Sequence, residues 1–109
     1  MKIISHKDCG ELLISLSGDL DHHAAKVAIP EISRLIELEL PTTLILDFSH
    51  ITFMDSSGIA LVIGCFKRAK SIGCTFFVKN VSKQANKVFN AAGIGKIITI
   101  EEQEAILTQ

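Results

Sequence analysis

The chain has 109 residues, of which 48% are hydrophobic and 21% are charged, and its formal net charge is −1. This length suits a single domain with a buried core, and this apolar content argues against a disordered chain. Eleven basic and twelve acidic residues create no field that attracts DNA or an anionic membrane, and the lack of Trp and Tyr leaves few rings for base stacking. We therefore expect neither nucleic acid nor a membrane as a partner.

The compartment is indicated by the N-terminal segment and by the cysteines. The first 15 residues lack the basic stretch, apolar run and cleavage site of a secretory signal, and no apolar run is long enough to cross a bilayer. Cys9, Cys65 and Cys74 are odd in number and form no Cys-x-x-Cys pair, which favours buried reduced thiols over disulfides, zinc ligands or a redox motif. These features predict a cytoplasmic protein without a metal or cofactor of its own.

The first half of the chain predicts a hairpin followed by a long helix. Residues 2–5 and 11–17 have the composition of short strands, and the turn residues between them favour a hairpin. Residues 22–39 predict a helix with Asp21 as its N-cap. Pro30 predicts a kink or a break in it, because proline cannot donate a backbone hydrogen bond. The apolar positions at helical spacing are Ala24, Val27, Ala28, Ile32, Leu35, Ile36 and Leu38.

The second half alternates strands and helices. The expected elements are a buried strand over 42–49, a helix over 56–73, a strand over 74–80, a helix over 82–93 capped by Ser82, a strand over 96–100 and a terminal helix over 101–109. Such alternation calls for a mostly parallel sheet covered by helices. We predict one α/β domain over residues 1–109 with an opening β-hairpin, a mixed sheet of about five strands, and about four helices.

Hydrolytic and dinucleotide sites do not fit the sequence. A serine hydrolase carries its nucleophile in Gly-x-Ser-x-Gly, but Met54 and Asp55 stand where the first glycine should be. All four histidines precede Ser56, so no later Asp and His complete a triad. The Gly-Ile-Gly at residues 93–95 is too short for a dinucleotide fingerprint and follows a helix instead of a strand. We therefore expect no catalytic residues and no enzyme activity.

The sequence fits neither a metal site nor the phospho-acceptor site of a receiver domain. Asp21, His22 and His23 do not predict a metal site, because neighbouring helical residues point about 100° apart. Asp47, near the end of a strand, is placed like the phospho-acceptor of a response-regulator receiver. That site also needs an acidic pair after the first strand, and residues 5–10 offer only one acid.

The Asp-Ser-Ser-Gly at residues 55–58 opens a helix that is apolar on most of its circumference. Serine and glycine at a helix start are usually explained by capping and close packing alone. Here the helix should lie against the sheet, so its first turn would emerge at one edge carrying two hydroxyl groups. Free N–H groups and the helix dipole favour negative charge at that end. A phosphoserine would therefore be tolerated at this position without unfolding the domain.

Three segments of the sequence carry a family resemblance. FMDSSGIALVIGCFKRAKSIG, residues 53–73, closely resembles the phosphorylation-site segment of bacterial anti-sigma factor antagonists, which are single-domain members of the sulfate-transporter and anti-sigma-antagonist (STAS) superfamily. SGDLDHHAA, residues 17–25, resembles the segment after their second strand, particularly in sporulation-type antagonists. KNVSKQANKVFNAAGIGKIITI, residues 79–100, resembles their C-terminal region. The resemblance covers nearly the whole chain and implies a single STAS-type fold.

The resemblance implies partner switching. In that scheme the dephosphorylated antagonist binds an anti-sigma factor that is also a serine kinase, and a sigma factor is released. The kinase then phosphorylates the first serine of the motif, here Ser56, and the complex dissociates. A metal-dependent serine phosphatase restores the antagonist. The nucleotide and magnesium belong to the kinase.

We expect the site to combine two segments at one edge of the sheet, because both follow a strand. Ser57 would cap the helix, Ser56 would be left exposed, and Asp55 would hold the loop or orient the Ser56 hydroxyl. The expected partner-binding residues are Asp19, Asp21, His22, His23, Asp55, Ser57 and Gly58.

The sequence departs from the family in two places and leaves some choices open. Ala60 stands where many relatives have a second glycine, and Pro30 interrupts the first helix. The alternative function is that of a STAS subunit in another signalling complex or a transport-accessory complex. Sporulation and stress response both remain open, with residues 19–23 favouring sporulation. We expect a monomer.

Overall fold

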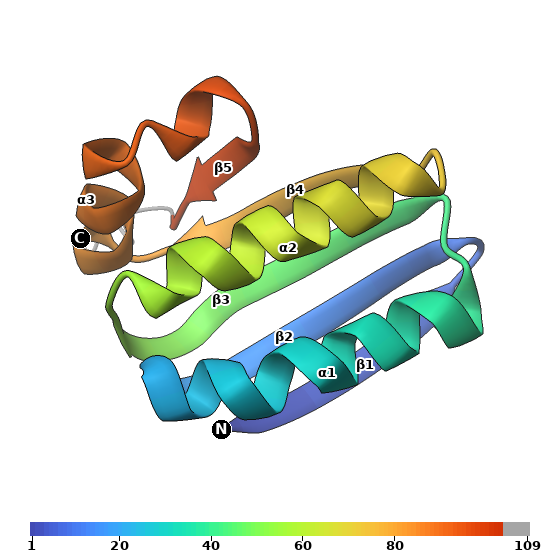
Figure 1. The fold of residues 1–109 in the computed structure, drawn as a ribbon, viewed down its shortest axis with the longest axis horizontal. Coiled ribbons are helices and arrows are strands. Elements are labelled where there is room, and N and C mark those ends of the chain that lie inside the picture. Colours follow the sequence, from blue (N-terminus) through green and yellow to red (C-terminus); the bar gives the residue numbers. More distant parts are fainter. Residues whose placement is uncertain (104–109) are drawn as a thin grey trace, which may run out of the picture.

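The computed structural model describes residues 1–103 as a five-stranded sheet in the order β1-β2-β3-β4-β5 with three α-helices (Figure 1). Only β1 is antiparallel to its neighbour, and the other strand pairs are parallel. The elements are β1 (Lys2–Asp8), β2 (Glu11–Leu20), α1 (His22–Glu39), β3 (Thr43–Met54), α2 (Ser57–Ser71), β4 (Thr75–Val81), α3 (Lys83–Ala91), the short 3₁₀ helix η1 (Ile94–Lys96) and β5 (Thr99–Glu102).

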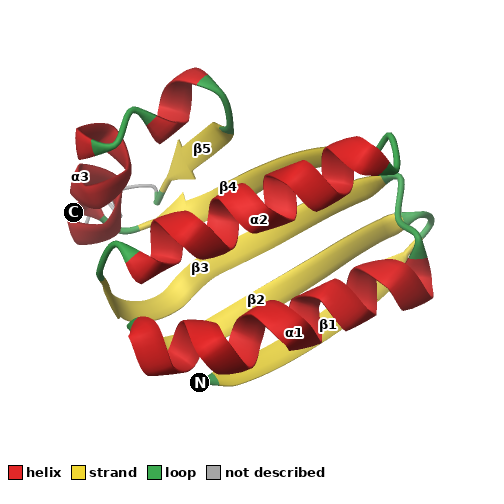
Figure 2. Ribbon diagram, in the orientation of Figure 1, coloured by secondary structure: helices red, strands yellow, loops and turns green. Residues whose placement is uncertain are grey.

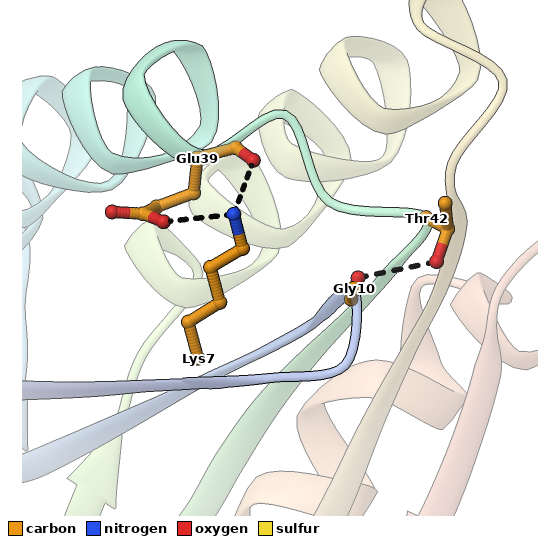
Figure 3. A network of polar contacts seen from close by, with 4 residues as sticks. All are labelled: Lys7, Gly10, Glu39 and Thr42. Atoms are coloured by element: carbon orange, nitrogen blue, oxygen red, sulfur yellow. Dashed lines mark hydrogen bonds and ion pairs between the residues drawn. The ribbon is translucent and has the colours of Figure 1, made fainter.

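The predicted hairpin is confirmed, with longer strands than expected. Cys9 and Gly10 have φ angles of 47° and 82°, the positive values that a two-residue type I′ turn requires at both central positions. Beside this turn, Lys7 contacts Glu39 at the end of α1, with Nζ 3.1 Å from the backbone oxygen and 3.2 Å from the carboxylate (Figure 3). Thr42 bonds to Gly10 as well, its N–H lying 2.8 Å and its hydroxyl 3.2 Å from the Gly10 oxygen.

The core lies between the sheet and the helices that cover one face of it. Ile14, Leu46 and Val78 are aligned across β2, β3 and β4 and are fully buried. Figure 2 shows α1 and α2 side by side over this face. Five of the seven apolar positions predicted for α1 are buried in the core, but Val27 and Leu38 are exposed, so the stripe is narrower than expected. α3 packs near the far end of β3, where the Phe89 ring lies 6.0 Å from the Phe48 ring.

Of the kink or break predicted at Pro30, the break is not found, because α1 continues as one helix from His22 to Glu39. Pro30 is exposed, and so is Lys26, whose backbone oxygen loses its usual N–H partner. Water can satisfy that oxygen, so the proline costs the helix little on this side. The helix ends at Leu40, which has a φ of 44°, just before Pro41.

Two further predictions about the elements are corrected. The strand expected over 42–49 extends to Met54, because β2 continues beside it and pairs Leu20 with Met54. The terminal helix expected from residue 101 is wrong at its start, because Glu101 and Glu102 belong to β5, and residues 104–109 lie outside the described part of the chain. In residues 1–103 no helix combines the length and the apolar character needed to cross a membrane.

The cysteines divide into two classes. Cys65 and Cys74 are buried, as expected of inert thiols, and burial raises the pKa of Cys65 to about 12. Cys9 is exposed at the hairpin turn, contrary to the expectation of a buried thiol. The two buried thiols are therefore parts of the apolar core.

Candidate functional site

The two segments expected to form the site lie at one edge of the sheet. β2 and β3 are parallel, and Leu20 pairs with Met54 at their carboxyl ends. The Asp55 N–H donates to the Leu20 oxygen at 3.3 Å, so the segment after β3 is joined to the segment after β2. We call residues 19–23 and 55–58 together the carboxyl edge.

The first segment of the carboxyl edge starts α1. The Ala24 N–H donates to Asp21 Oδ1 at 2.9 Å, which confirms Asp21 as the N-cap. This hydrogen bond, helped by the charge of His23, lowers the pKa of Asp21. His22 and His23 are exposed, and their rings lie edge to face with centroids 6.0 Å apart. Asp19 is also exposed, and its carboxylate accepts a hydrogen bond from the Thr52 hydroxyl at 2.6 Å. Residues 1–103 contain no group of three side chains suited to a metal ion.

The second segment starts α2, and here one prediction is wrong. Ser57 was expected to cap the helix with its hydroxyl, but it is the first helical residue, and its N–H donates to Asp55 Oδ1 at 2.8 Å. The Asp55 carboxylate therefore satisfies the first free N–H of the helix, and the expectation that Asp55 holds this loop is confirmed. Ser56 is exposed, and its side chain makes no capping hydrogen bond. Its hydroxyl is thus left accessible to another molecule.

Gly58 is buried beneath the first turn of α2. A Cβ atom at this position would lie 2.4 Å from Cγ and Sδ of Met54 and 3.2 Å from Leu20 Cδ2. Both neighbours are fully buried, so neither can move aside without disturbing the core. Gly58 therefore lets the first turn of α2 pack directly on the ends of β2 and β3, and this packing places Ser56 next to those strand ends.

Gln84 of α3 is a further residue of the site that the sequence did not reveal. Its side-chain amide accepts from the Met54 N–H at 2.9 Å and donates to the Met54 oxygen at 2.8 Å. β4 pairs with β3 only as far as Asp47, so this amide takes the place of a neighbouring strand for Met54. The strand end two residues before Ser56 is thereby held on both sides.

Asp47, considered above as a phospho-acceptor, is held by hydrogen bonds inside the sheet. Asn80 Nδ2 and the Ser49 N–H donate to Asp47 Oδ1 at 2.9 and 3.0 Å. Partial burial raises the pKa of Asp47, but these hydrogen bonds outweigh burial, and the pKa lies below its usual value. Asn80 has a φ of 60°, a left-handed conformation that asparagine tolerates. The group therefore joins β3 to the end of β4.

These features define a small α/β domain with an accessible serine at a helix start. The STAS domain model matches residues 2–105, and the chain belongs to this family.

Its relatives include anti-sigma factor antagonists. The anti-sigma F factor antagonist of Lysinibacillus sphaericus is 34% identical over 96 residues, which cover 87% of this chain and 82% of that protein. The unphosphorylated anti-sigma factor antagonist SpoIIAA has the same fold, with a TM-score of 0.78, 31% identity, and coverage of 91% of this chain and 87% of that chain. The phosphorylated form of the Bacillus cell fate determinant SpoIIAA matches with a TM-score of 0.70, 31% identity, and coverage of 91% and 90%.

Proposed function

We propose that this protein is an anti-sigma factor antagonist that binds an anti-sigma factor when Ser56 is unphosphorylated, and thereby frees a sigma factor. The observation that carries the proposal is the exposed Ser56 hydroxyl, which makes no capping hydrogen bond because the Asp55 carboxylate accepts from the first N–H of α2. The segment that holds Ser56 is joined to the segment that precedes His22 and His23 by the hydrogen bond from the Asp55 N–H to the Leu20 oxygen. The name of the Lysinibacillus sphaericus relative favours a factor of the sigma F type, and so a role in sporulation.

The partner in this proposal is also the kinase that modifies Ser56. The nucleotide and magnesium belong to that kinase, a metal-dependent serine phosphatase removes the phosphate, and this chain has no catalytic role. Asp19, Asp21, His22, His23, Asp55, Ser57 and Gly58 form or support the surface that the kinase contacts. The chain acts as a monomer in the cytoplasm.

The switch works at the surface and needs no refolding. A phosphate adds about −1.5 to −2 charges at pH 7. At the start of α2 the phosphate meets free N–H groups, so its effect on the domain is small or favourable. In a packed interface the same charge must stay solvated, and a loss of about 3 kcal/mol weakens binding roughly a hundredfold. The match of SpoIIAA to this fold in both its forms supports a switch of this kind.

Replacement of Ser56 by alanine tests the acceptor. The protein should remain folded, should bind the anti-sigma kinase, and should take up no phosphate from ATP when measured by intact-protein mass spectrometry. Ser57→Ala is the matched control, because Ser57 uses only its backbone N–H in the cap, and this variant should be phosphorylated normally. Phosphate uptake by Ser56→Ala at the wild-type rate would show that the acceptor is another residue.

The histidine pair tests the binding surface. The double substitution His22→Ala and His23→Ala should weaken binding of the anti-sigma factor by about 5- to 30-fold, since exposed side chains at an interface centre contribute about 1–2 kcal/mol. Stability should change little, because both side chains are exposed. His6→Ala with His50→Ala is the control, because these histidines are exposed away from the carboxyl edge. Unchanged affinity in the first variant would remove this segment from the interface.

A further inference from the structure

A groove with a volume of about 520 Å³ lies between the start of α2 and one face of α3. Figure 1 shows α3 near the amino-terminal end of α2, although the two helices are separated in the sequence by β4. The walls are mostly apolar, and Lys87 contributes the one charged side chain among the described residues that line the groove. The lining residues are Ser56, Ile59, Gln84, Lys87, Val88, Ala91 and Ala92.

Gln84 joins α3 to the strand end that leads to Ser56. Gln84, Lys87 and Val88 are spaced by three and four positions, so they lie on the same face of the helix. The Gln84 amide is bound to the Met54 backbone at 2.8 and 2.9 Å, and Met54 precedes Ser56 by two residues. Lys87 lies one turn further along that face. The Lys87 side chain is exposed and lines the same groove as Ser56.

We propose that Lys87 is the cation that binds the phosphate on Ser56. The proposal rests on the function proposed above, in which Ser56 is phosphorylated. A phosphate oxygen and an ammonium group form a charge-assisted hydrogen bond, which is stronger than one between neutral groups. On its other side Ser56 is preceded by Asp55, whose carboxylate already accepts from the Ser57 N–H and repels a second anion. The charges on both sides thus direct the phosphate toward α3.

This placement has a consequence for partner switching. The phosphate, bound to Lys87, spans the mouth of the groove and brings its hydration shell over the apolar side chains of Ile59 and Val88. A partner that packs against Ser56 in the unphosphorylated protein loses access to both the groove and the Lys87 ammonium group. One modification thereby changes two neighbouring parts of the surface.

The second pKa of the phosphate, measured by ³¹P NMR, tests the contact. Phosphoserine is placed at position 56 by genetic encoding, so the measurement does not depend on any kinase. An ammonium group nearby favours the dianion, so Lys87→Gln should raise this pKa by about 0.2–0.7 pH unit, as expected for an exposed ion pair. The matched control is Lys83→Gln, a lysine on the same helix that does not line the groove, and its shift should be distinctly smaller.

Equal shifts in the two variants, or no shift in Lys87→Gln, would overturn the assignment of Lys87. The shift should also shrink as salt is added, because salt screens an exposed pair. The proposed function fails separately, when the anti-sigma kinase leaves Ser56 of the natural protein unmodified. In that case the titration of the encoded phosphoserine still decides whether Lys87 binds the phosphate.

Discussion

At the amino ends of β2, β3 and β4 the polar groups bind to one another, whereas at the carboxyl edge several are left exposed. The Thr42 N–H donates to the Gly10 oxygen at 2.8 Å, and the Thr75 N–H donates to the Thr42 oxygen at 2.9 Å, which joins three strands in a row. Lys7 and Glu39 add an ion pair at the same end (Figure 3). At the carboxyl edge, by contrast, Ser56 and the two histidines are exposed.

The two ends of the sheet therefore have different roles. At the amino ends, hydrogen bonds join the starts of the strands, and the polar atoms there are bound within the domain. At the other end Gly58 lets α2 pack directly on Met54 and Leu20, and Gln84 binds the Met54 backbone. The residues next to Ser56 are thus held within the domain, while Ser56 itself is exposed.

Gly58→Ala should have the largest effect on the carboxyl edge. The added methyl group would overlap Met54 and press on Leu20, so unfolding free energy should fall by about 1–3 kcal/mol in urea titrations. Gly64→Ala is the control on the same helix, because nothing lies within 4 Å of the added Cβ. This control should leave stability unchanged or raise it by up to about 1 kcal/mol. Similar losses in both variants would contradict the packing role of Gly58.

Gln84→Ala should have the next largest effect. It removes two hydrogen bonds from the backbone of buried Met54 and should cost about 1–2 kcal/mol of unfolding free energy. The Met54 amide should also exchange with deuterium faster than in the wild type, which shows that the effect is local. Asn90→Ala, which removes an exposed amide from the same helix, is the control and should change neither quantity much. If Met54 exchange is unaltered in Gln84→Ala, then Gln84 does not hold the strand end.

Asp47→Asn should give the smallest effect, seen as a difference in pH dependence. The pKa of Asp47 is lowered in the fold, so the unfolded chain binds the proton at higher pH than the folded chain does. The stability from the ionised carboxylate is complete above the unfolded pKa of about 3.9 and is lost as the pH falls through the folded pKa.

Asparagine keeps the oxygen that accepts from Asn80 and Ser49 but cannot ionise. The Asp47→Asn protein should therefore lose less stability than the wild type when urea midpoints at pH 5 and pH 3 are compared. Asp21, whose pKa is also lowered, is present in both proteins and cancels in the difference. Parallel pH profiles would show that the ionised Asp47 contributes nothing to the fold.

Short-range features of the molecule could be predicted from the sequence. Asp21 and Ser82 cap their helices through N–H groups three residues further along, so each cap is contained within four residues of sequence. The hairpin turn depends on two adjacent residues, Cys9 and Gly10. The cap of α2 was harder to predict, because Asp55, Ser56 and Ser57 are all polar and each could have capped the helix. Which of them does so depends on how the chain leaves β3.

The sequence by itself determined the order of strands and helices, the apolar stripes that form the core, and the polar segments that follow β2 and β3, because periodicity and turn chemistry act over a few residues. Only the tertiary structure decided that Gln84 meets Met54, thirty residues away, and that Lys87 shares a groove with Ser56. Such contacts depend on where α3 packs against the sheet. The helical pattern shows that Phe89 faces inward, but no local pattern in the sequence encodes which part of the core receives it, here the region of Phe48.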